Sequence, residues 1–445
     1  METTRRAADI RSIEEELIRT RCFYYIRVGY DRRRMELLPH NRIGGGRSRL
    51  EQTWHVREED GRVVLCIAGD EGITCALTQQ ADGSWHGQWR VYECMAVQLA
   101  PAIGDGKWMH VEADALAEPI DAVYLWVDGS DPGFQQSMRR ASVAHGLASG
   151  DERLATRRFR DIAELKYSLR SLEAYAPWIR HVYIVTNGQV PAWLNVREPR
   201  MSLVTHEMLF PERTHLPTFN SHAIEVHLHR VPGLSRRFLY LNDDIFFGGP
   251  VSPADFLTAD GVQKIYLECW DLPVDLYAGP AHDRAFAYTQ VLLNRVVPPR
   301  GLRRAVAHTP QMYDRELIEE IEAIWPREME ETSAHPFRTP RDFVFWVLYN
   351  HFALESEKHC PAHRAVTVYD NSDEYGFIML HRHIPKLVDA LDQAMFQRPK
   401  FLCVNDDLDD SEEAEVGLSL CKEFLERYFP SPSRFELADG TDRPA

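Results

Sequence analysis

Two carboxylates stand side by side directly after an apolar segment of the chain. Residues 238–241 read FLYL, Asn242, Asp243 and Asp244 follow, and the sequence then turns apolar again. Adjacent carboxylates at the end of a strand repel one another, and a divalent cation between them offsets that repulsion. Mg²⁺ or Mn²⁺ suits such oxygen ligands and would bridge them to a diphosphate. A solvated turn is the alternative, but the apolar residues on both sides favour a metal site.

The same arrangement recurs near the end of the chain. The apolar residues 401–404 (FLCV) lead into Asn405 and Asp406. Two such clusters in one chain indicate a site more strongly than either does alone, so Asn405 and Asp406 are predicted as further metal ligands. The acidic residues 409–415 read as a solvated surface segment.

A third cluster follows the apolar part of segment 120–132 (IDAVYLWVDGSDP). In open α/β sheets, ligands bind outside the carboxyl ends of the strands. Asp121, Asp128 and Asp131 are therefore predicted near a bound nucleotide. Taken alone, the segment is better explained by a loop in which Asp and Gly serve as turn residues.

The segment 216–230 (LPTFNSHAIEVHLHR) predicts a short helix. Asn220 or Ser221 would cap it, and Glu225 and His229 would then lie four positions apart on one face. Both side chains could address substrate hydroxyl groups. A surface helix with an internal pair explains the pattern equally well.

One histidine and two arginines complete the candidates. His308 precedes Thr309-Pro310, and by itself it is more simply a structural histidine. Arg338 and Arg341 flank a proline, and guanidinium groups bind phosphate oxygens through paired hydrogen bonds. The arginines are predicted to clamp phosphate, with ordinary surface arginines as the alternative.

The elements that must position these residues form an alternating pattern. Apolar runs typical of buried strands alternate with helical segments, which predicts a mostly parallel, Rossmann-like α/β sheet. The predicted strands are 122–127, 181–186, 201–204, 238–241 and 264–267. A helix through 162–172 ends before Pro177, residues 285–355 are predicted to be helical, and a last helix covers 416–428.

The N-terminal residues have a different sequence pattern. After a charged helical stretch, short alternating runs such as 62–67 and 88–92 are separated by Gly-rich turn signals, including one at 104–106. They predict a short helix and a small antiparallel sheet. The expected domains are a β-rich accessory domain over 1–118, a catalytic domain over 119–437 and a tail over 438–445.

Composition narrows the classes of function. The 445 residues carry a formal net charge of -16, a poor balance for wrapping nucleic acid, so no nucleic-acid partner is expected. Eight cysteines without a CxxC pair read as free thiols. With no apolar leader or spanning segment visible, the sequence predicts a cytoplasmic protein. Peripheral membrane association and homo-oligomer formation stay open.

Four segments in order resemble the Stealth family of sugar-1-phosphate transferases, which includes bacterial capsule polymerases and the catalytic subunit of the lysosomal-enzyme N-acetylglucosamine-1-phosphotransferase. They are IDAVYLWVDGSDP, the long block from LKYSLRSLEAYAPWIRHVYIVTNGQVPAWL to FLYLNDDIFFG, VAHTPQMYDRELIEEI with ETSAHPFRTPRDF, and KFLCVNDDLDD with the helix after it. The resemblance covers about 120–437.

The resemblance implies a core related to the GT-A fold, a UDP-sugar donor and Mg²⁺ or Mn²⁺. It implies transfer of a hexose 1-phosphate, with N-acetylhexosamine expected, to a glycan or polysaccharide hydroxyl, which forms a phosphodiester and releases UMP. The chain lacks the long insertions of the animal enzyme, which favours bacterial exopolysaccharide or capsule synthesis.

The resemblance also implies roles for individual residues. It implies that the donor lies at Asp121, Asn187 and the loop Trp126–Asp131, and the phosphates and metal at Asn242–Asp244. His308 is predicted as the general base, Arg338 as the group that stabilises the equatorial oxygens, and Asn405 as a further active-site residue. The alternatives are a GT-A glycosyltransferase that releases UDP and a catalytically silent glycan-binding protein.

Overall fold

The computed structural model describes residues 2–59, 61–91, 95–102, 118–148, 150–299, 301–381, 383–409 and 411–438. The chain divides into two compact units. One unit holds Met1–Trp108 together with Tyr369–Gly376 and Val388–Lys400, and the other holds the remaining residues. Two short segments that the sequence analysis gave to the catalytic domain therefore belong with the N-terminal unit. The predicted turn at 104–106 and residues 439–445 of the predicted tail lie outside the described residues.

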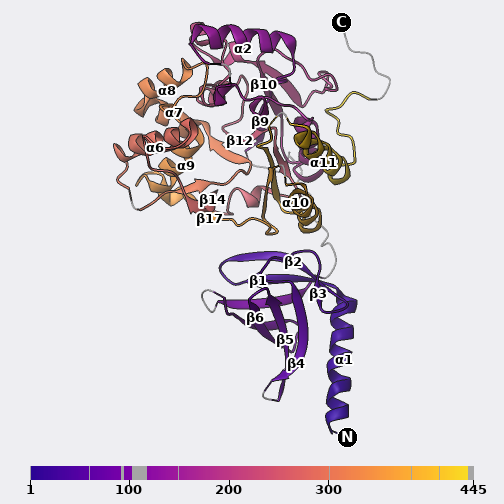
Figure 1. The fold of residues 1–445 in the computed structure, drawn as a ribbon. Helices are drawn as coiled ribbons and strands as arrows, with labels where there is room; N and C mark the ends of the chain where they lie inside the picture. The colour runs from indigo at the N-terminus through magenta and orange to yellow at the C-terminus, as the bar shows by residue number, and fades with distance from the viewer. Residues whose placement is uncertain are drawn as a thin grey trace. The chain divides into compact units, whose positions relative to one another are not determined.

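The N-terminal unit is a helix followed by a closed antiparallel barrel (Figure 1). Side chains of the strands alternate between buried and less buried positions, and the buried set, including Phe23, Leu65 and Leu99, fills the interior. The β-rich prediction is confirmed, whereas closure through β1 and β8 was not predicted. The elements are α1 (Glu2–Thr20), β1 (Cys22–Arg27), β2 (Asp31–Leu38), β3 (Arg42–Ile43), β4 (Thr53–Glu59), β5 (Arg62–Gly69), β6 (Gly72–Gln79), β7 (Trp85–Trp89) and β8 (Ala96–Pro101).

The distant segment 388–400 packs on this barrel, and its side chains form hydrogen bonds with the backbone of the barrel. The Gln393 side chain accepts the amide of Gly46 at 2.9 Å, and Gln397 both accepts from and donates to the backbone of Arg34. A Cβ at Gly45 would lie 2.4 Å from the Phe396 ring. Glycine at this position is therefore what lets the aromatic ring approach the barrel.

The second unit is built on a five-stranded sheet of order β11-β10-β9-β12-β16. Four strands are parallel and β16 alone runs antiparallel to its neighbour, which confirms the predicted mostly parallel α/β core. Their apolar runs are buried on both faces, as the sequence pattern requires. The strands are β9 (Ile120–Leu125), β10 (Val182–Thr186), β11 (Met201–Thr205), β12 (Arg237–Asn242) and β16 (Gln311–Asp314).

Two three-stranded sheets, of order β13-β19-β18 and β15-β14-β17, complete the strands of this unit. The helical prediction for 285–355 is wrong in part, because β15 and β16 interrupt it. The further strands are β13 (Ile245–Phe247), β14 (Gln263–Asp271), β15 (Arg304–Val306), β17 (His363–Thr367), β18 (Tyr375–Leu380) and β19 (Phe401–Asp406).

Helices α6 to α9 gather beside the sheet in Figure 1 and share one apolar core with it. None of the helices in the described part of the chain is both long and apolar enough to cross a membrane. The α-helices are α2 (Pro132–Ala144), α3 (Glu164–Tyr175), α4 (His206–Leu209), α5 (Ser221–Glu225), α6 (Ala281–Asn294), α7 (Arg315–Ile324), α8 (Pro326–Ser333), α9 (Phe345–Glu355), α10 (Ile384–Gln397) and α11 (Glu412–Tyr428).

Candidate active site

The two acidic clusters of the sequence meet in space. Asp243 and Asp244 form the turn between β12 and β13, and β13 pairs with β19, which carries Asn405. The amide of Asn405 donates to Oδ2 of Asp244 at 3.1 Å. Strand pairing thus joins segments 161 positions apart in the sequence, as the repeated pattern suggested.

Burial and mutual repulsion act on the carboxylates of this centre. Burial raises the pKa of Asp243 well above its usual range, and the charges of Asp244 and Asp161 raise it further. The pKa of Glu164 is raised by burial and then by Asp243 and Asp161. The sequence analysis missed Asp161 and Glu164, although two acids three positions apart at the start of a predicted helix were a signal.

One structural observation supports a cation-binding role for these residues. Oδ1 of Asp244 is buried and has no hydrogen-bond partner among the described residues. No three His, Cys, Asp or Glu side chains within that described part converge on a common metal position. Mg²⁺ is usually held by one or two carboxylates together with substrate phosphates, so the acidic pair and Asn405 suit it when a diphosphate completes the set.

Asp406 has partners of its own within the protein. Its Oδ2 accepts from Arg160 at 2.7 Å, and its Oδ1 accepts the amide of Leu408 at 2.8 Å. Of the two predicted ligands on β19, the structure therefore favours Asn405, and a metal-binding role for Asp406 stays a prediction.

His308 lies just after β15, next to the acidic centre. Its ring packs 5.9 Å from the Trp346 ring and 5.3 Å from the Phe377 ring, measured between centroids. Burial lowers the pKa of His308, and the charge of Asp244 opposes that shift. A neutral imidazole beside a carboxylate is the form that can take a proton.

Arg338 is held against the start of α5. Its guanidinium donates to the Ser221 hydroxyl at 2.9 Å. Asn220 caps α5 by accepting the amide of His222, as predicted, and its own amide donates to Asp342 at 2.9 Å.

Asp342 is a buried hub that the sequence analysis did not single out. It also bonds to the rings of His222 and His335 and to Thr339. Because these donors favour its charged form, the pKa of Asp342 lies below its usual range despite burial. The carboxylate thereby fixes the backbone that carries Arg338 to the backbone that carries Ser221.

Glu225 and Asn242 share one hydroxyl group. The Tyr240 hydroxyl lies 3.1 Å from Oε1 of Glu225 and 2.7 Å from Oδ1 of Asn242. Oε2 of Glu225 is buried without a hydrogen-bond partner in the described structure. An orphaned carboxylate oxygen beside the acidic centre is suited to bind a substrate hydroxyl. Tyr240 gave no signal beyond its place in an apolar strand.

His229 is not on the same helical face as Glu225. Helix α5 ends at Glu225, and His229 follows in a separate 3-10 turn over Leu228–Arg230. Its Nε2 lies 3.1 Å from Glu322, and burial lowers its pKa to about 3. The predicted pairing is wrong because the four-residue spacing matters only within one continuous helix.

The predicted donor loop leaves the same sheet edge as the acidic pair. Asn242 pairs in register with Leu125, the residue before Trp126. The side chain of Gln189, which follows the exposed Asn187 after β10, bonds to the backbone N–H and C=O of Asp128, both at 2.9 Å. These loops are therefore tied together at the carboxyl ends of their strands.

The aspartates of this loop also have local structural tasks. Oδ1 of Asp128 accepts from the amide and hydroxyl of Ser130. Asp131 caps α2 by accepting the amide of Phe134 at 2.7 Å. Asp131 thus has the turn-forming role that the sequence analysis gave as the alternative.

Asp121 lies at the opposite end of β9, so its placement at the donor site is wrong. It is the second residue of the strand, roughly 16 Å from Trp126 at 3.3 Å per residue. Its fully buried carboxylate accepts two bonds from Arg180, at 2.8 and 2.5 Å, and the Ser235 amide at 2.7 Å. These bonds hold the start of the sheet together.

We expect Asp121→Asn to lower the free energy of unfolding by about 2–3 kcal/mol, because Arg180 and the Ser235 amide each lose a charged acceptor. Urea denaturation measures this, with the exposed Asp260→Asn as control. The KM for donor of the folded variant should stay at the wild-type value. A large rise in that KM without loss of stability would restore Asp121 to the donor site.

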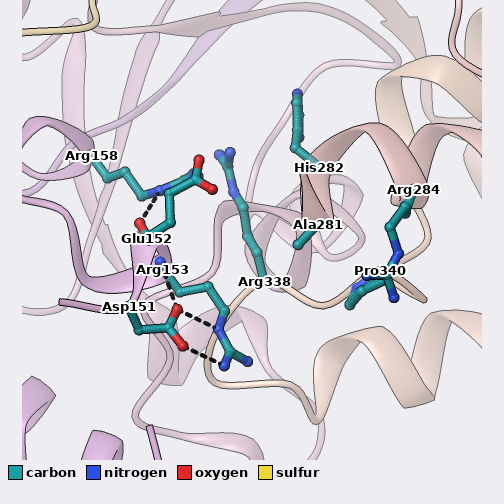
Figure 2. Close-up of a pocket in the computed structure, with 9 residues that line it drawn as sticks. All are labelled: Asp151, Glu152, Arg153, Arg158, Ala281, His282, Arg284, Arg338 and Pro340. Carbon is teal, nitrogen blue, oxygen red and sulfur yellow. Dashed lines mark hydrogen bonds and ion pairs between the residues drawn. The ribbon is translucent and has the colours of Figure 1, made fainter. Parts of the chain in front are cut away.

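A cavity of about 270 Å³ lies beside Arg338 (Figure 2). Three segments form it: residues 151–158, the first turn of α6, and residues 338–340. Its lining residues are Asp151, Glu152, Arg153, Arg158, Ala281, His282, Arg284, Arg338 and Pro340.

Comparison with known sequences gives one consistent family. Profiles of the Stealth protein conserved regions CR1, CR2, CR3 and CR4 match residues 118–146, 158–265, 307–355 and 395–445, together more than half of the chain. The three motifs that carry the acidic pair, His308 with Arg338, and Asn405 each fall within one of these regions.

Curated relatives of this chain include proteins named exopolysaccharide phosphotransferases. The exopolysaccharide phosphotransferase SCO6023 of Streptomyces coelicolor is 36% identical over 349 residues, which are 74% of this chain and 55% of that protein. CpsY of Mycobacterium tuberculosis H37Rv, also named exopolysaccharide phosphotransferase, is 35% identical over 338 residues, 75% of this chain and 60% of its own. The chain thus spans little more than half the length of these relatives.

A solved structure, mouse xyloside xylosyltransferase 1 in its apo form, aligns with a TM-score of 0.31 and 12% identity over 64% of this chain and 97% of that chain.

Proposed function

Because this chain belongs to the Stealth family, we propose that it transfers a hexose 1-phosphate from a UDP-sugar to a hydroxyl group of an exopolysaccharide. N-acetylhexosamine 1-phosphate is the proposed group. The observation that carries the proposal is the half-buried acidic pair, with its orphaned Asp244 oxygen, in a family whose relatives are named exopolysaccharide phosphotransferases.

The proposed reaction is a displacement at phosphorus. An acceptor hydroxyl oxygen attacks the β-phosphorus of the donor, the bond from that phosphorus to the bridging oxygen breaks, and UMP leaves. The hydroxyl proton passes to His308, whose imidazole is neutral at the working pH because burial lowers its pKa. The sugar keeps its C1–O bond throughout, so its anomeric configuration does not change.

Charge around the phosphorus is the main demand of such chemistry. Mg²⁺ or Mn²⁺ bound by Asp243, Asp244 and Asn405 would supply positive charge to the diphosphate. Arg338, oriented by the Ser221 hydroxyl, stabilises the equatorial oxygens. Glu225, held by Tyr240, binds a sugar hydroxyl through its unpartnered oxygen.

We also propose that the core is related to the GT-A fold. The support is a mostly parallel sheet with an acidic pair at the carboxyl end of a central strand, beside the loop after β9. In this arrangement Trp126, Asp128 and Asn187 lie where a nucleotide would bind.

The nucleotide product tests the proposal directly. We expect UMP, together with a phosphodiester in the glycan, because attack at the β-phosphorus carries one phosphate to the acceptor. Chromatography of the nucleotide and ³¹P NMR of the glycan read both products from one reaction. UDP with a phosphorus-free glycan would identify a glycosyltransferase instead, and no turnover of any UDP-sugar would favour a silent glycan-binding protein.

A further inference from the structure

Large apolar side chains gather at the surface where β14 ends. Trp270 is 50% exposed, Val274 62% and Tyr277 89%, within one short stretch of the chain. Leu302, which stands two positions before β15, is 70% exposed. Single exposed apolar residues are normal on a protein surface, but several in two adjoining segments indicate a binding surface. We call these four residues the aromatic patch.

The backbone that carries the aromatic patch is held by tertiary contacts. The Leu272 amide donates to the Arg303 carbonyl at 2.7 Å, which joins the two segments. The side chain of Gln290 in α6 donates to the Pro273 carbonyl, also at 2.7 Å. Leu272 itself is buried in an apolar cluster that includes Phe286 of α6. The exposed side chains therefore project from supported backbone.

A turn presents Tyr277 to solvent. The Asp275 carboxylate accepts the amides of Tyr277 and Ala278, at 2.8 and 3.0 Å. Gly279 follows with a φ of 87°, a conformation that favours glycine, and α6 begins two residues later. The Tyr277 hydroxyl bonds to no other residue in the described part of the chain. Its ring is therefore available to a ligand.

Both segments of the aromatic patch lead into the candidate active site. The first turn of α6 follows the patch and lines the cavity beside Arg338 with His282 (Figure 2). On the other segment, β15 runs from Leu302 towards His308. These two residues are six positions apart, so they lie at most roughly 20 Å from one another at 3.3 Å per residue.

Packed rings connect α6 to the candidate base. The ring centroids of His282 and Phe286 are 4.2 Å apart, those of Phe286 and Trp346 5.4 Å, and those of Trp346 and His308 5.9 Å. The helix that follows the aromatic patch is thus fixed relative to His308. A ligand that contacts both the patch and His308 must be chain-like, because it has to extend over this packed surface.

The charges near the aromatic patch favour an uncharged ligand. Residues 265–283 contain no Lys or Arg. The acids of this segment are Glu268, Asp271, Asp275 and Asp283. The adjoining Arg303 is buried and paired with Glu355 through two bonds of 2.8 Å. A surface of this kind is a poor match for phosphate groups or for an anionic membrane, both of which are bound by unpaired cations.

We infer that the aromatic patch binds sugar rings of the acceptor glycan at a distance from the hydroxyl group that reacts. A pyranose ring has an apolar C–H face, which packs on Trp or Tyr, and hydroxyl groups, which donate to carboxylates such as the exposed Asp271. This inference rests on the proposed function, in which the acceptor is a polysaccharide. It adds that the enzyme recognises several sugar units of the acceptor and not the reacting unit alone.

Saturation-transfer NMR measures this binding without turnover. The probes are three neutral pentasaccharides: chitopentaose, cellopentaose and maltopentaose. We expect wild type to saturate ring C–H protons of at least one of them. Tyr277→Ala and Trp270→Ala should each raise the Kd of that probe about three- to tenfold, the contribution of one aromatic contact. Because Trp270 and Tyr277 are in separate places on the chain, either variant is informative if the other does not fold.

Two further variants make the comparison specific. Tyr277→Phe keeps the aromatic ring and should bind the probe like wild type. Val143→Ala removes an apolar side chain that is 75% exposed but lies on α2, outside the aromatic patch, and it should also bind like wild type. The KM for UDP-N-acetylglucosamine as donor should be unchanged in all four variants, because the donor binds at the acidic pair.

Three results would overturn the inference. One is a wild-type protein that saturates none of the three probes. Another is equal binding by wild type and both alanine variants. The third is unchanged probe binding by Tyr277→Ala together with lost binding to vesicles of phosphatidylethanolamine and phosphatidylglycerol, which would make the patch a membrane contact. UDP release by the wild-type protein would instead refute the proposed function, and the NMR measurement would still report on the patch.

Discussion

Replacing Asp244 by Asn is expected to abolish turnover and leave the protein as stable as before. The carboxylate is half-buried, its buried Oδ1 lacks a hydrogen-bond donor in the described structure, and burial raises its pKa. A group whose pKa rises on folding holds its negative charge at a cost in free energy at neutral pH, so removing the charge should not lower the Tm. Loss of activity without loss of stability is the mark of a residue kept for chemistry.

The matched control is Asp406→Asn, the same change in the second NDD cluster, at the position that corresponds to Asp243. Because Asp406 binds Arg160, we expect it to keep turnover within about tenfold of wild type. EDTA should abolish activity, and Mg²⁺ or Mn²⁺ should restore it. Equal losses in the two variants, or full activity after metal removal, would contradict the assignment of Asp243 and Asp244 as the metal pair.

Replacing His308 by Ala is expected to lower kcat by about 10²–10⁴, the usual contribution of a general base. The reason is its position beside Asp244, between two aromatic rings, in the neutral form. The pH profile of kcat separates this role from a structural one. Wild type should lose activity as pH falls through the lowered pKa of His308, and the residual activity of the variant should lack that limb.

His282 provides the comparison for this experiment. Its ring stacks with that of His222 at 5.8 Å and lines the cavity beside Arg338, and its pKa is also lowered by burial. His282→Ala should retain the acidic limb of the kcat profile. If instead His282→Ala removes the acidic limb and His308→Ala retains it, His282 is the base.

The sequence predicted the core of the second unit because its strands are buried on both faces. A short continuous apolar run such as 182–186 is typical of a strand in the middle of a covered parallel sheet, and the polar residues that end such runs mark the functional edge of the sheet. The acidic pair and Asn405 could be found in this way. Asn405 comes into contact with Asp244 because β19, which carries Asn405, pairs with β13, which follows the acidic pair.

The errors come from information that a local pattern does not contain. Asp121 is an exception, because it precedes the predicted strand 122–127 and the carboxyl-end rule already argued against it. Glu225 and His229 have helical spacing, but every residue from His222 to His229 is buried, so the segment lacks the amphipathic pattern that would fix the length of its helix. Asp342 gains its role only from tertiary contacts.

The docking of residues 388–400 on the barrel has a consequence for the order in which the unit is completed during synthesis. Gly46 and Gln393, which share a hydrogen bond, are 347 positions apart. A ribosome adds about 5–20 residues per second, so the barrel surface at Gly45 waits roughly 20–70 s after its own synthesis before Phe396 can cover it. A nascent chain stalled before residue 388 displays that surface uncovered, and is the species that a chaperone would have most reason to bind.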